Sequence, residues 1–573
     1  MVKNMETVYL FGDNEDNRKI YDGRGKRKGV LIGERDWNAL DKQIESIVKK
    51  AKSFTQRNIV VVNTKDESLN VAVCKGFAER IKGASAEEKE GFFHSLRISV
   101  VGDFISQKAY GEFIADASGC ITYVDKYQQI AMDFIERYPL ARFMDERHID
   151  YQTSLVREGV EINVFMLGFG KTNRQIFLTS VANNQFLCEG ENEPVLKQVN
   201  YYIFDKDNVK ESGLFDLSYY NYADSVDSYD PAEYLPLPAL PANEQYCQLP
   251  VEDERVFEKM QALLGNEKDV NFAIIACGTD GENIALAKKL LEKQKAWKAE
   301  SLVLFVKSRV MRKEASGITA ENCFFIGNEE DCVFNIEEIL GDRIYRMSQL
   351  RNAIYDLEYE ITCGNVNVTE EYVQKNRENA MKSWFTSKSQ LERDSSTYGC
   401  LSLRSKLNLM GLDYCAKEEN DLPALTEAEY LAWYAQEDMP DFSTYNLKAD
   451  GKPIVCYTLN FPDSRRKNMA IHEHQRWNSF MLSKGMTPAS KKQILEEKVE
   501  RNGKLRYTNG KNYAEHRHGN LTTFEGLIEF RQMVAARDGC AEAEKDVIKY
   551  DYQLLDDAYW LLDKSGCKIV KMQ

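Results

Sequence analysis

The chain has 573 residues, of which 43% are hydrophobic and 29% are charged, and its formal net charge is −15. This composition predicts a globular protein of about three or four domains, and the acidic surface argues against binding of bulk nucleic acid or anionic membranes. No run approaches the ~18 apolar residues of a membrane span, and the first residues lack a signal-peptide core. The 13 cysteines form no CxxC pair, which is typical of reduced thiols. We therefore expect a soluble, cytoplasmic α/β protein.

The first 150 residues alternate between patterns of buried strands and of amphipathic helices. Apolar runs predict strands at 8–11, 58–62 and 97–101, and helical spacing predicts helices at 37–51, 69–81 and 127–138. This alternation is typical of a parallel sheet with helices on its faces. We assign residues 1–150 to a first Rossmann-like domain.

The same pattern returns more clearly in residues 151–345. The predicted strands are 162–167, 201–204, 272–277, 302–306 and 323–326, with a helix at 282–295. Five of the 12 prolines fall at 231–250, inside an irregular segment that spans 216–250. Because proline cannot donate to a sheet ladder, we expect this insert to be a surface excursion outside the core. The region is predicted to be a second Rossmann-like domain.

A glycine turn, GFGKTN, follows the first strand of this second domain and opens a predicted helix. Gly168 permits a tight turn, and Gly170 lets the backbone approach a pyrophosphate whose charge sits at the helix N-terminus. Lys171 and Arg174 add positive charge there, and Asn173 stands where the dinucleotide fingerprint has its third small residue. These residues predict a site for an adenine nucleotide.

Two more strand ends carry candidate ligand-binding residues. Asp205 ends the second strand, where an acid usually holds a ribose; it lies 35 residues past the second glycine of the turn, beyond the usual ~20. Its alternative role is to cap a loop. A second turn, CGTDGEN, places Gly278, Thr279 and Asp280 at another strand end, where they either line the pocket or cap the next helix.

These turns resemble the TrkA-N family, the nucleotide-binding domain of potassium-transport regulators. The family pattern has a glycine turn, an acid after the second strand, and a strand followed by G-x-D-x-x-N, which Gly278, Asp280 and Asn283 match. The resemblance covers residues 160–345 and implies binding of NAD(H), ATP or a related adenine nucleotide as a regulatory ligand. Asn173 and the proline-rich insert depart from the pattern.

Helical patterns dominate the rest of the chain. The spacing predicts helices at 372–387, 425–436, 469–483 and 546–564. Because the alternation of strands is lost, we assign 346–455 to a helical connector and 456–573 to a separate module.

The last module resembles the ryanodine-receptor-type (RyR) repeat. The matching residues are His474, Trp477, Lys484, Gly485, Leu521, Gly566, Ile569 and Val570. Met486 stands where the family has a second tryptophan, and His518-Gly519 replaces its His-Pro turn. The resemblance implies recognition of a nucleotide or of a nucleotide-derived signal.

The residues of this module allow two interpretations. His474 and Trp477 share one helical face, so they either form an aromatic pocket for a base or pack together in a core. Arg393 and Ser395 near a predicted helix start either contact an anion or cap the helix beside a solvated arginine. The HEH spacing excludes an HExxH zinc site, and we assign no metal ligand and no catalytic residue.

The first functional hypothesis is a nucleotide sensor, an oligomer of identical chains, whose adenine-containing ligand (NAD, ADP-ribose, ATP or a cyclic nucleotide) shifts the domain arrangement. Ion-transport regulation and antiviral signalling fit the two resemblances. The alternatives are an NAD-dependent enzyme, for which we find neither a P-loop nor GxSxG, and a degenerate Rossmann scaffold whose RyR-like module binds a partner protein.

Overall fold

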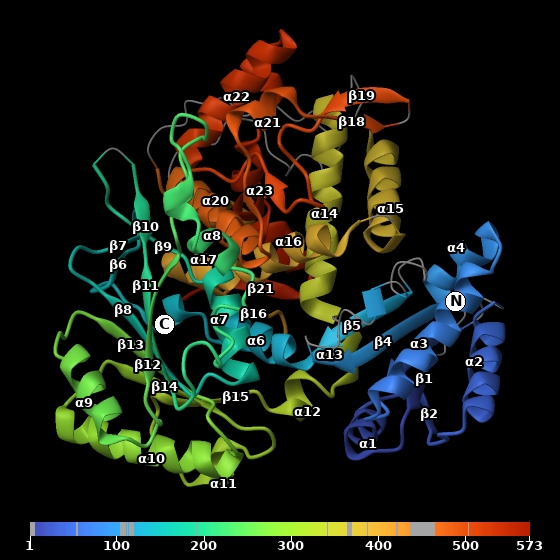
Figure 1. The fold of residues 1–573 in the computed structure, drawn as a ribbon, viewed down its shortest axis with the longest axis horizontal. Coiled ribbons are helices and arrows are strands. Elements are labelled where there is room, and N and C mark those ends of the chain that lie inside the picture. The colour runs from blue at the N-terminus through green and yellow to red at the C-terminus, as the bar shows by residue number, and fades with distance from the viewer. Residues whose placement is uncertain are drawn as a thin grey trace.

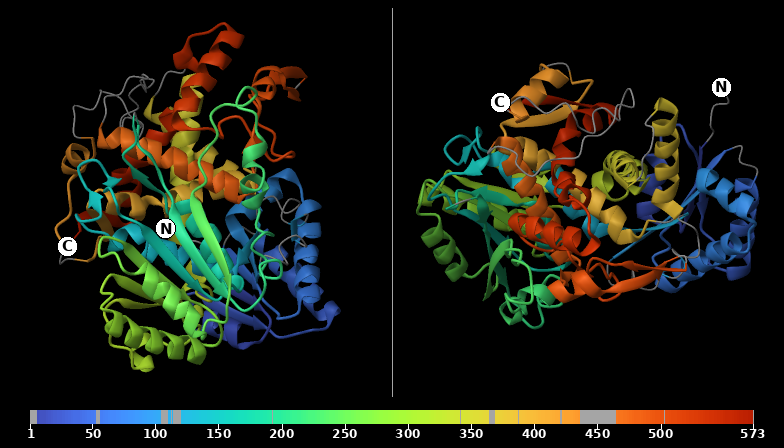
Figure 2. Two further views of the ribbon diagram at one scale, coloured as in Figure 1. Left: turned by 60° about the vertical axis from the view of Figure 1, so that its left-hand side comes forward. Right: turned by 90° about the horizontal axis from the view of Figure 1, so that it is seen from above.

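The computed structural model describes residues 6–52, 56–103, 110–111, 113, 120–191, 193–340, 342–363, 369–386, 388–419, 422–435, 464–501 and 503–572. Figure 1 shows the N-terminal sheet (blue) beside a second sheet (cyan to green), with the C-terminal helices (yellow to red) above them in this view. The two further views keep the N-terminal sheet at one end of the molecule (Figure 2). The predicted class, two parallel α/β sheets followed by a mainly helical part, is confirmed.

The N-terminal sheet has five parallel strands in the order β2-β1-β3-β4-β5. They are β1 (Glu6–Phe11), β2 (Lys28–Ile32), β3 (Arg57–Val62), β4 (Leu96–Gly102) and β5 (Ile121–Asp125), joined through α1 (Glu15–Asp22), α2 (Trp37–Ala51), α3 (Glu67–Lys82) and α4 (Ala86–Ser95). This is the flavodoxin-like doubly wound order. The run IVVV at 59–62 is fully buried because both faces of a parallel sheet are covered.

The second sheet has six parallel strands in the order β12-β11-β8-β13-β14-β15. They are β8 (Ile162–Leu167), β11 (Val199–Asp205), β12 (Ala242–Gln248), β13 (Val270–Ile275), β14 (Leu302–Lys307) and β15 (Cys323–Ile326). Helices α7 (Lys171–Asn183), α9 (Glu254–Leu263) and α10 (Asp280–Trp297) connect them. In chain order this is 3-2-1-4-5-6, the order of dinucleotide-binding domains, and its switch point lies between β8 and β13.

The proline-rich insert corrects the expectation of a surface excursion. Its last part is β12, which forms the outer edge of the six-stranded sheet, and the side chains of Tyr219 and Tyr222 are fully buried. An edge strand pairs on one side only, so flanking prolines such as Pro241 and Pro250 do not interrupt a ladder. The short α8 (Tyr220–Ala223) belongs to the same buried segment.

Helix α6 (Lys126–Arg137) follows β5 of the N-terminal sheet but packs on the second one. The ring of Phe134 lies edge-on to Phe305 of β14, with centroids 4.9 Å apart. In return, α12 (Glu329–Cys332) and α13 (Ile336–Leu340), which follow β15, contribute to a core shared with the buried residues Val8 and Ile59 of the N-terminal sheet. Helices that follow each sheet therefore cover part of the other sheet. The domain boundary at residue 150 stays a prediction.

A small four-stranded sheet and the C-terminal helices complete the fold. The sheet has the order β10-β9-β7-β6, with β6 (Ile149–Asp150), β7 (Leu155–Val156), β9 (Phe186–Cys188) and β10 (Val195–Lys197). The main C-terminal elements are α14 (Asp342–Cys363), α15 (Glu370–Thr386), α16 (Gln390–Leu401), α17 (Leu403–Leu409), β16 (Leu412–Ala416), α18 (Glu427–Ala435), α20 (Arg465–Ser483), α21 (Lys491–Glu496), α22 (Phe524–Asp538) and β21 (Cys567–Lys571). Short strands β17 (Thr487–Pro488) and β20 (Arg517–His518) form one pair, and β18 (Lys498–Arg501) and β19 (Lys504–Tyr507) form another.

The C-terminal part is tied together by contacts distant in sequence. Strand β21 pairs antiparallel with β16 of the predicted connector, so the two proposed modules share a sheet. The helix predicted at 546–564 is two helices, α23 (Lys549–Asp556) and α24 (Ala558–Lys564), which meet at Asp557. Helix α20 packs on α7, and the ring of His472 hydrogen-bonds the carbonyl of Gln185 at 2.8 Å.

Candidate functional site

The glycine turn after β8 sits at the switch point of the six-stranded sheet. Gly168 adopts φ +86°, and a Cβ there would lie 2.6 Å from the Cα of Cys277 after β13, so glycine is required. Gly170 is the N-cap of α7 and offers no side chain to its free amides. No atom lies within 4 Å of where a Cβ on Gly170 would stand. The N-terminus of α7 therefore faces open space, where anions bind to helices.

Asp205 lies beside this turn, as the sequence predicts. Its Oδ2 accepts a hydrogen bond from the backbone N–H of Phe169 at 2.5 Å, and its Oδ1 accepts one from Asp207 N–H at 3.0 Å. The carboxylate has acceptor capacity beyond these two bonds, because each oxygen carries two lone pairs. The acid and the glycine turn thus form one cluster despite their separation in sequence.

Asn173 stabilises the glycine turn through a side-chain hydrogen bond. It is fully buried, and its Nδ2 donates to the carbonyl of Gly168 at 2.6 Å. Asn17 donates to the carbonyl of Gly12 at 2.6 Å after β1, and Asn283 donates to that of Gly278 at 3.4 Å after β13. Each asparagine lies five residues after its glycine, so G-x-x-x-x-N marks three strand ends in this chain. This repeat is visible in the sequence alone.

The basic residues of the turn contact protein groups. Lys171 Nζ lies 2.7 Å from Oδ2 of Asp103, which follows β4 of the N-terminal sheet. This carboxylate raises the pKa of Lys171 by hydrogen bonding, more than partial burial lowers it. Arg174 donates from Nε to the carbonyl of Phe169 at 3.1 Å. Lys171 therefore links the glycine turn of one sheet to the carboxyl edge of the other.

The turn after β13 is occupied by structural contacts. Thr279 and Glu282 form a capping box at the start of α10. The Asp280 carboxylate accepts hydrogen bonds from the backbone N–H groups of Arg309 at 2.7 Å and Val310 at 3.0 Å, and from two neighbouring groups. Burial raises the pKa of Asp280, but these backbone bonds outweigh it and hold the pKa below its usual value. Of the two roles foreseen, pocket lining and helix capping, Thr279 shows helix capping. Asp280 instead anchors the loop after β14, a role that the sequence does not predict.

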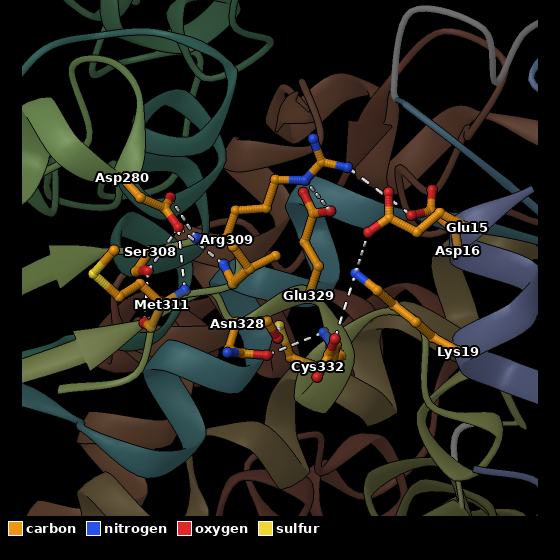
Figure 3. A network of polar contacts seen from close by, with 12 residues as sticks. Glu15, Asp16, Lys19, Asp280, Ser308, Arg309, Met311, Asn328, Glu329 and Cys332 are labelled. Atoms are coloured by element: carbon orange, nitrogen blue, oxygen red, sulfur yellow. Dashed lines mark hydrogen bonds and ion pairs between the residues drawn. The ribbon is translucent and has the colours of Figure 1, made fainter. Parts of the chain in front are cut away.

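Ion pairs join the carboxyl edges of the two sheets. Figure 3 shows Arg309, which follows β14, reaching Glu329 at 2.7 Å and buried Asp16 of the N-terminal sheet at 3.9 Å. Lys19 of α1 pairs with Glu330 at 3.5 Å. Because Lys171–Asp103 joins the same edges, the α7 turn lies where the two sheets meet.

A second candidate site is a cavity of about 500 Å³ in the C-terminal part. His474, Trp477 and Ser395 line it together, so the structure brings three of the four predicted pocket residues to one place. The guanidinium of Arg393 instead donates to the carbonyls of Lys388 at 2.7 Å and Trp384 at 3.3 Å, which ties it to the local helix ends.

The two aromatic residues of this cavity are held differently. His474 is buried, with Nε2 2.8 Å from the carbonyl of Thr522 and Nδ1 3.2 Å from the Asp551 carboxylate. Trp477 is half-buried, stacks on His474 with centroids 6.0 Å apart, and meets the edge of His518 at 5.0 Å. His474 is thus both a packed residue and part of the cavity wall. Among the described residues no His, Cys, Asp or Glu cluster could hold a metal ion.

Comparison with known proteins adds little to this geometry. No protein-family model matches the chain, and no curated protein matches it. Among solved structures, a ketoreductase domain from the bacillaene assembly line aligns at 11% identity over 53% of this chain and 70% of that chain, with a TM-score of 0.17. So loose a superposition carries no argument, and the resemblances to the TrkA-N and RyR families stay predictions.

The strand order alone defines the class. The chain holds two doubly wound α/β sheets, one in the flavodoxin-like order and one in the dinucleotide-binding order, with their carboxyl edges facing each other. No helix in the described ranges is long and apolar enough to cross a membrane.

Proposed function

We propose that this chain is a regulatory protein that binds an adenine nucleotide, of the NAD or ADP-ribose type, at the switch point between β8 and β13. The observation that carries this proposal is the N-terminus of α7, which has no side-chain cap and faces open space at Gly170. Ligands of open α/β sheets bind outside the carboxyl ends of the strands, at the switch point. Backbone amides and the helix dipole there favour a diphosphate.

In this proposal each residue of the turn has a defined part. The amides at the start of α7 hold the diphosphate, Lys171 adds charge, and Asp205 accepts the ribose hydroxyls. Asn173 and Gly168 shape the turn without touching the ligand, because the asparagine is buried and the glycine packs on the β13 turn. Thr279 and Asp280 are already used by the protein, so they are not among the proposed contacts.

The position of Asp103 is the reason for proposing regulation. A phosphate at the α7 N-terminus competes with this carboxylate for Lys171, and like charges near one cation repel each other. Nucleotide binding therefore weakens one link between the two sheets, and a ligand that favours one arrangement over another shifts their populations. A function in ion-transport regulation or antiviral signalling, and assembly into a homo-oligomer, belong to this proposal through the family resemblances alone.

A ligand scan of the full chain tests the proposal. NAD, NADH, ATP, ADP-ribose and cyclic nucleotides are screened for thermal stabilisation, and NAD turnover is followed in parallel. We expect stabilisation by at least one nucleotide, several-fold weaker binding by Lys171→Ala, and several-fold tighter binding by Asp103→Asn, since this change removes a negative charge near the phosphate. Turnover of NAD would contradict a regulatory role and favour an NAD-dependent enzyme. No response to any nucleotide would favour the degenerate Rossmann scaffold.

A further inference from the structure

The C-terminal cavity is a separate space from the α7 turn and has the character of a ligand site. Its volume of about 500 Å³ lies within the ~300–1,000 Å³ that small-molecule pockets usually occupy. Its walls come from α14, α16, α20 and α22 together with residues 508–520 and with residues 544–551, which run into α23. Elements from the predicted connector and from the RyR-like module therefore build it jointly.

Aromatic side chains contribute to the cavity wall. Trp477 and Tyr513 contribute rings, each close to His518, with centroids 5.0 Å and 6.3 Å from it. Tyr355 and Tyr550 add a second pair with ring centroids 4.5 Å apart. Aromatic rings stack on planar heterocycles largely independently of the substituents that the heterocycle carries. The wall is thus suited to a flat aromatic ligand.

The charges of the lining are balanced in number, with five basic and five acidic side chains among the described residues. Behind the wall, Lys406 and Arg476, which do not line the cavity, join Arg351 around Glu473. The Glu473 carboxylate lies 3.0 Å from Arg351, 2.9 Å from Lys406 and 2.8 Å from Arg476. The side chains of these three cations are 13%, 0% and 0% exposed, so one buried carboxylate serves three nearly buried cations.

Neighbouring groups do not remove this excess. Asp551 is the next carboxylate and is bonded by His474; burial raises its pKa, which draws it toward the neutral form. Even with Asp551 charged, three cations face two carboxylates. The Nη1 of Arg476 is buried and has no hydrogen-bond partner in the described part of the chain. A buried charge without a counter-charge is costly, so an anion bound in the cavity would lower the energy of the cation cluster around Glu473.

We propose that this cavity is a second ligand site, and that it takes a nucleoside monophosphate or a molecule of the same chemistry, a planar base with one anionic group. The base stacks on Trp477, and the anion pairs with Arg351, which both lines the cavity and belongs to the cation cluster. Guanidinium suits this task because its fork can bond Glu473 and a phosphate at once. The site is independent of the α7 turn.

Binding of AMP, adenosine and inorganic phosphate to the full chain is the test, measured by calorimetry in the Gly170→Asp background so that the α7 turn does not contribute. We expect AMP to bind at least tenfold more tightly than adenosine or phosphate. Arg351→Gln lowers AMP affinity about tenfold and leaves adenosine unchanged, since a charge-assisted hydrogen bond is lost. Arg147→Gln, at an exposed arginine paired with Asp145, is the matched control and binds like the parent.

The base contact is tested by two substitutions at one position. We expect Trp477→Leu to abolish AMP binding and Trp477→Phe to retain part of it, because phenylalanine can still stack on the base. Partial binding by Trp477→Phe distinguishes the loss of stacking from a folding defect. Equal affinities for AMP and adenosine, or no binding of AMP, would overturn the proposal. Binding that survives both Arg351→Gln and Trp477→Leu would place the ligand elsewhere and overturn it too. None of these results depends on whether the α7 turn binds a nucleotide.

Discussion

Replacing Lys406 by methionine should make the protein more stable at neutral pH. The Lys406 ammonium is fully buried and bonds Ser402 Oγ at 2.6 Å and Glu473 at 2.9 Å. Burial, with Arg476 and Arg351 nearby, outweighs Glu473 and lowers the pKa of Lys406 from 10.5 to about 8. At about 1.4 kcal/mol per pH unit, keeping it protonated at pH 7 costs about 3 kcal/mol. The substitution also removes the hydrogen bond to Ser402, and this loss lowers the free energy of unfolding by about 1 kcal/mol.

The pH dependence follows from the same pKa values. Between pH 8 and 10.5 the unfolded chain holds a proton that the folded chain has released, so the free energy of unfolding rises with pH in this window. Below pH 8 Lys406 is protonated in both states, so the full cost of burying its charge lowers the free energy of unfolding. Lys406→Met has no such proton, so its advantage of about 1–2 kcal/mol at pH 7 should disappear by pH 10.5.

Denaturant titrations at pH 7, 8, 9 and 10.5 measure this difference from the unfolding midpoints at constant slope. Lys288→Met, at an exposed lysine of α10, is the control and should change the free energy of unfolding little at any pH. Glu473→Gln should act in the opposite direction and destabilise by about 3–5 kcal/mol, because it leaves three cations without their carboxylate. The reasoning would be refuted if Lys406→Met were less stable than wild type at pH 7. It would also be refuted if the difference in free energy of unfolding between the two proteins did not change with pH.

Three further changes test the strand-end turns. Asn173→Ala removes the 2.6 Å bond to Gly168 O and should cost about 1–3 kcal/mol, visible in the denaturation midpoint; a neutral result would show that the turn holds without it. Asp280→Asn turns an amide toward backbone donors and should destabilise by a similar amount. Asp253→Asn, at the N-cap of α9 where asparagine caps as well as aspartate, is the comparison. Gly168→Ala should lower stability more than Gly170→Ala, since only the former places a Cβ 2.6 Å from Cys277.

Buried strands and long helices were predictable because their periodicity is local. The run 162–167 and the helix 37–51 match β8 and α2 in full. Strand β2 was not predicted, since only one of its five residues is buried and the edge of a sheet leaves a weak apolar signal. The proline content of the insert predicts exposure, but it says nothing of the tyrosines, which are buried.

The candidate site was predictable in part. The glycine turn and Asp205 come together as expected, because strand ends of one parallel sheet share an edge. Arg351, Lys406 and Glu473 were not singled out, since they come from three helices and only tertiary packing brings them together. Likewise, nothing local in the sequence pairs Lys171 with Asp103, which lie on different sheets.

The most direct test of the central claim is the effect of one charge at the mouth of α7. Gly170→Asp places a carboxylate in the open space at the helix N-terminus, and Gly265→Asp adds the same charge on an exposed loop after α9. With NAD or ADP-ribose, whichever stabilises the wild type more, at about 100 times its Kd, wild type and Gly265→Asp should each gain about 2.7 kcal/mol of stability; these ligands carry a diphosphate and not the single anionic group of the C-terminal site. Gly170→Asp should gain none; equal stabilisation of all three proteins would contradict binding at this turn.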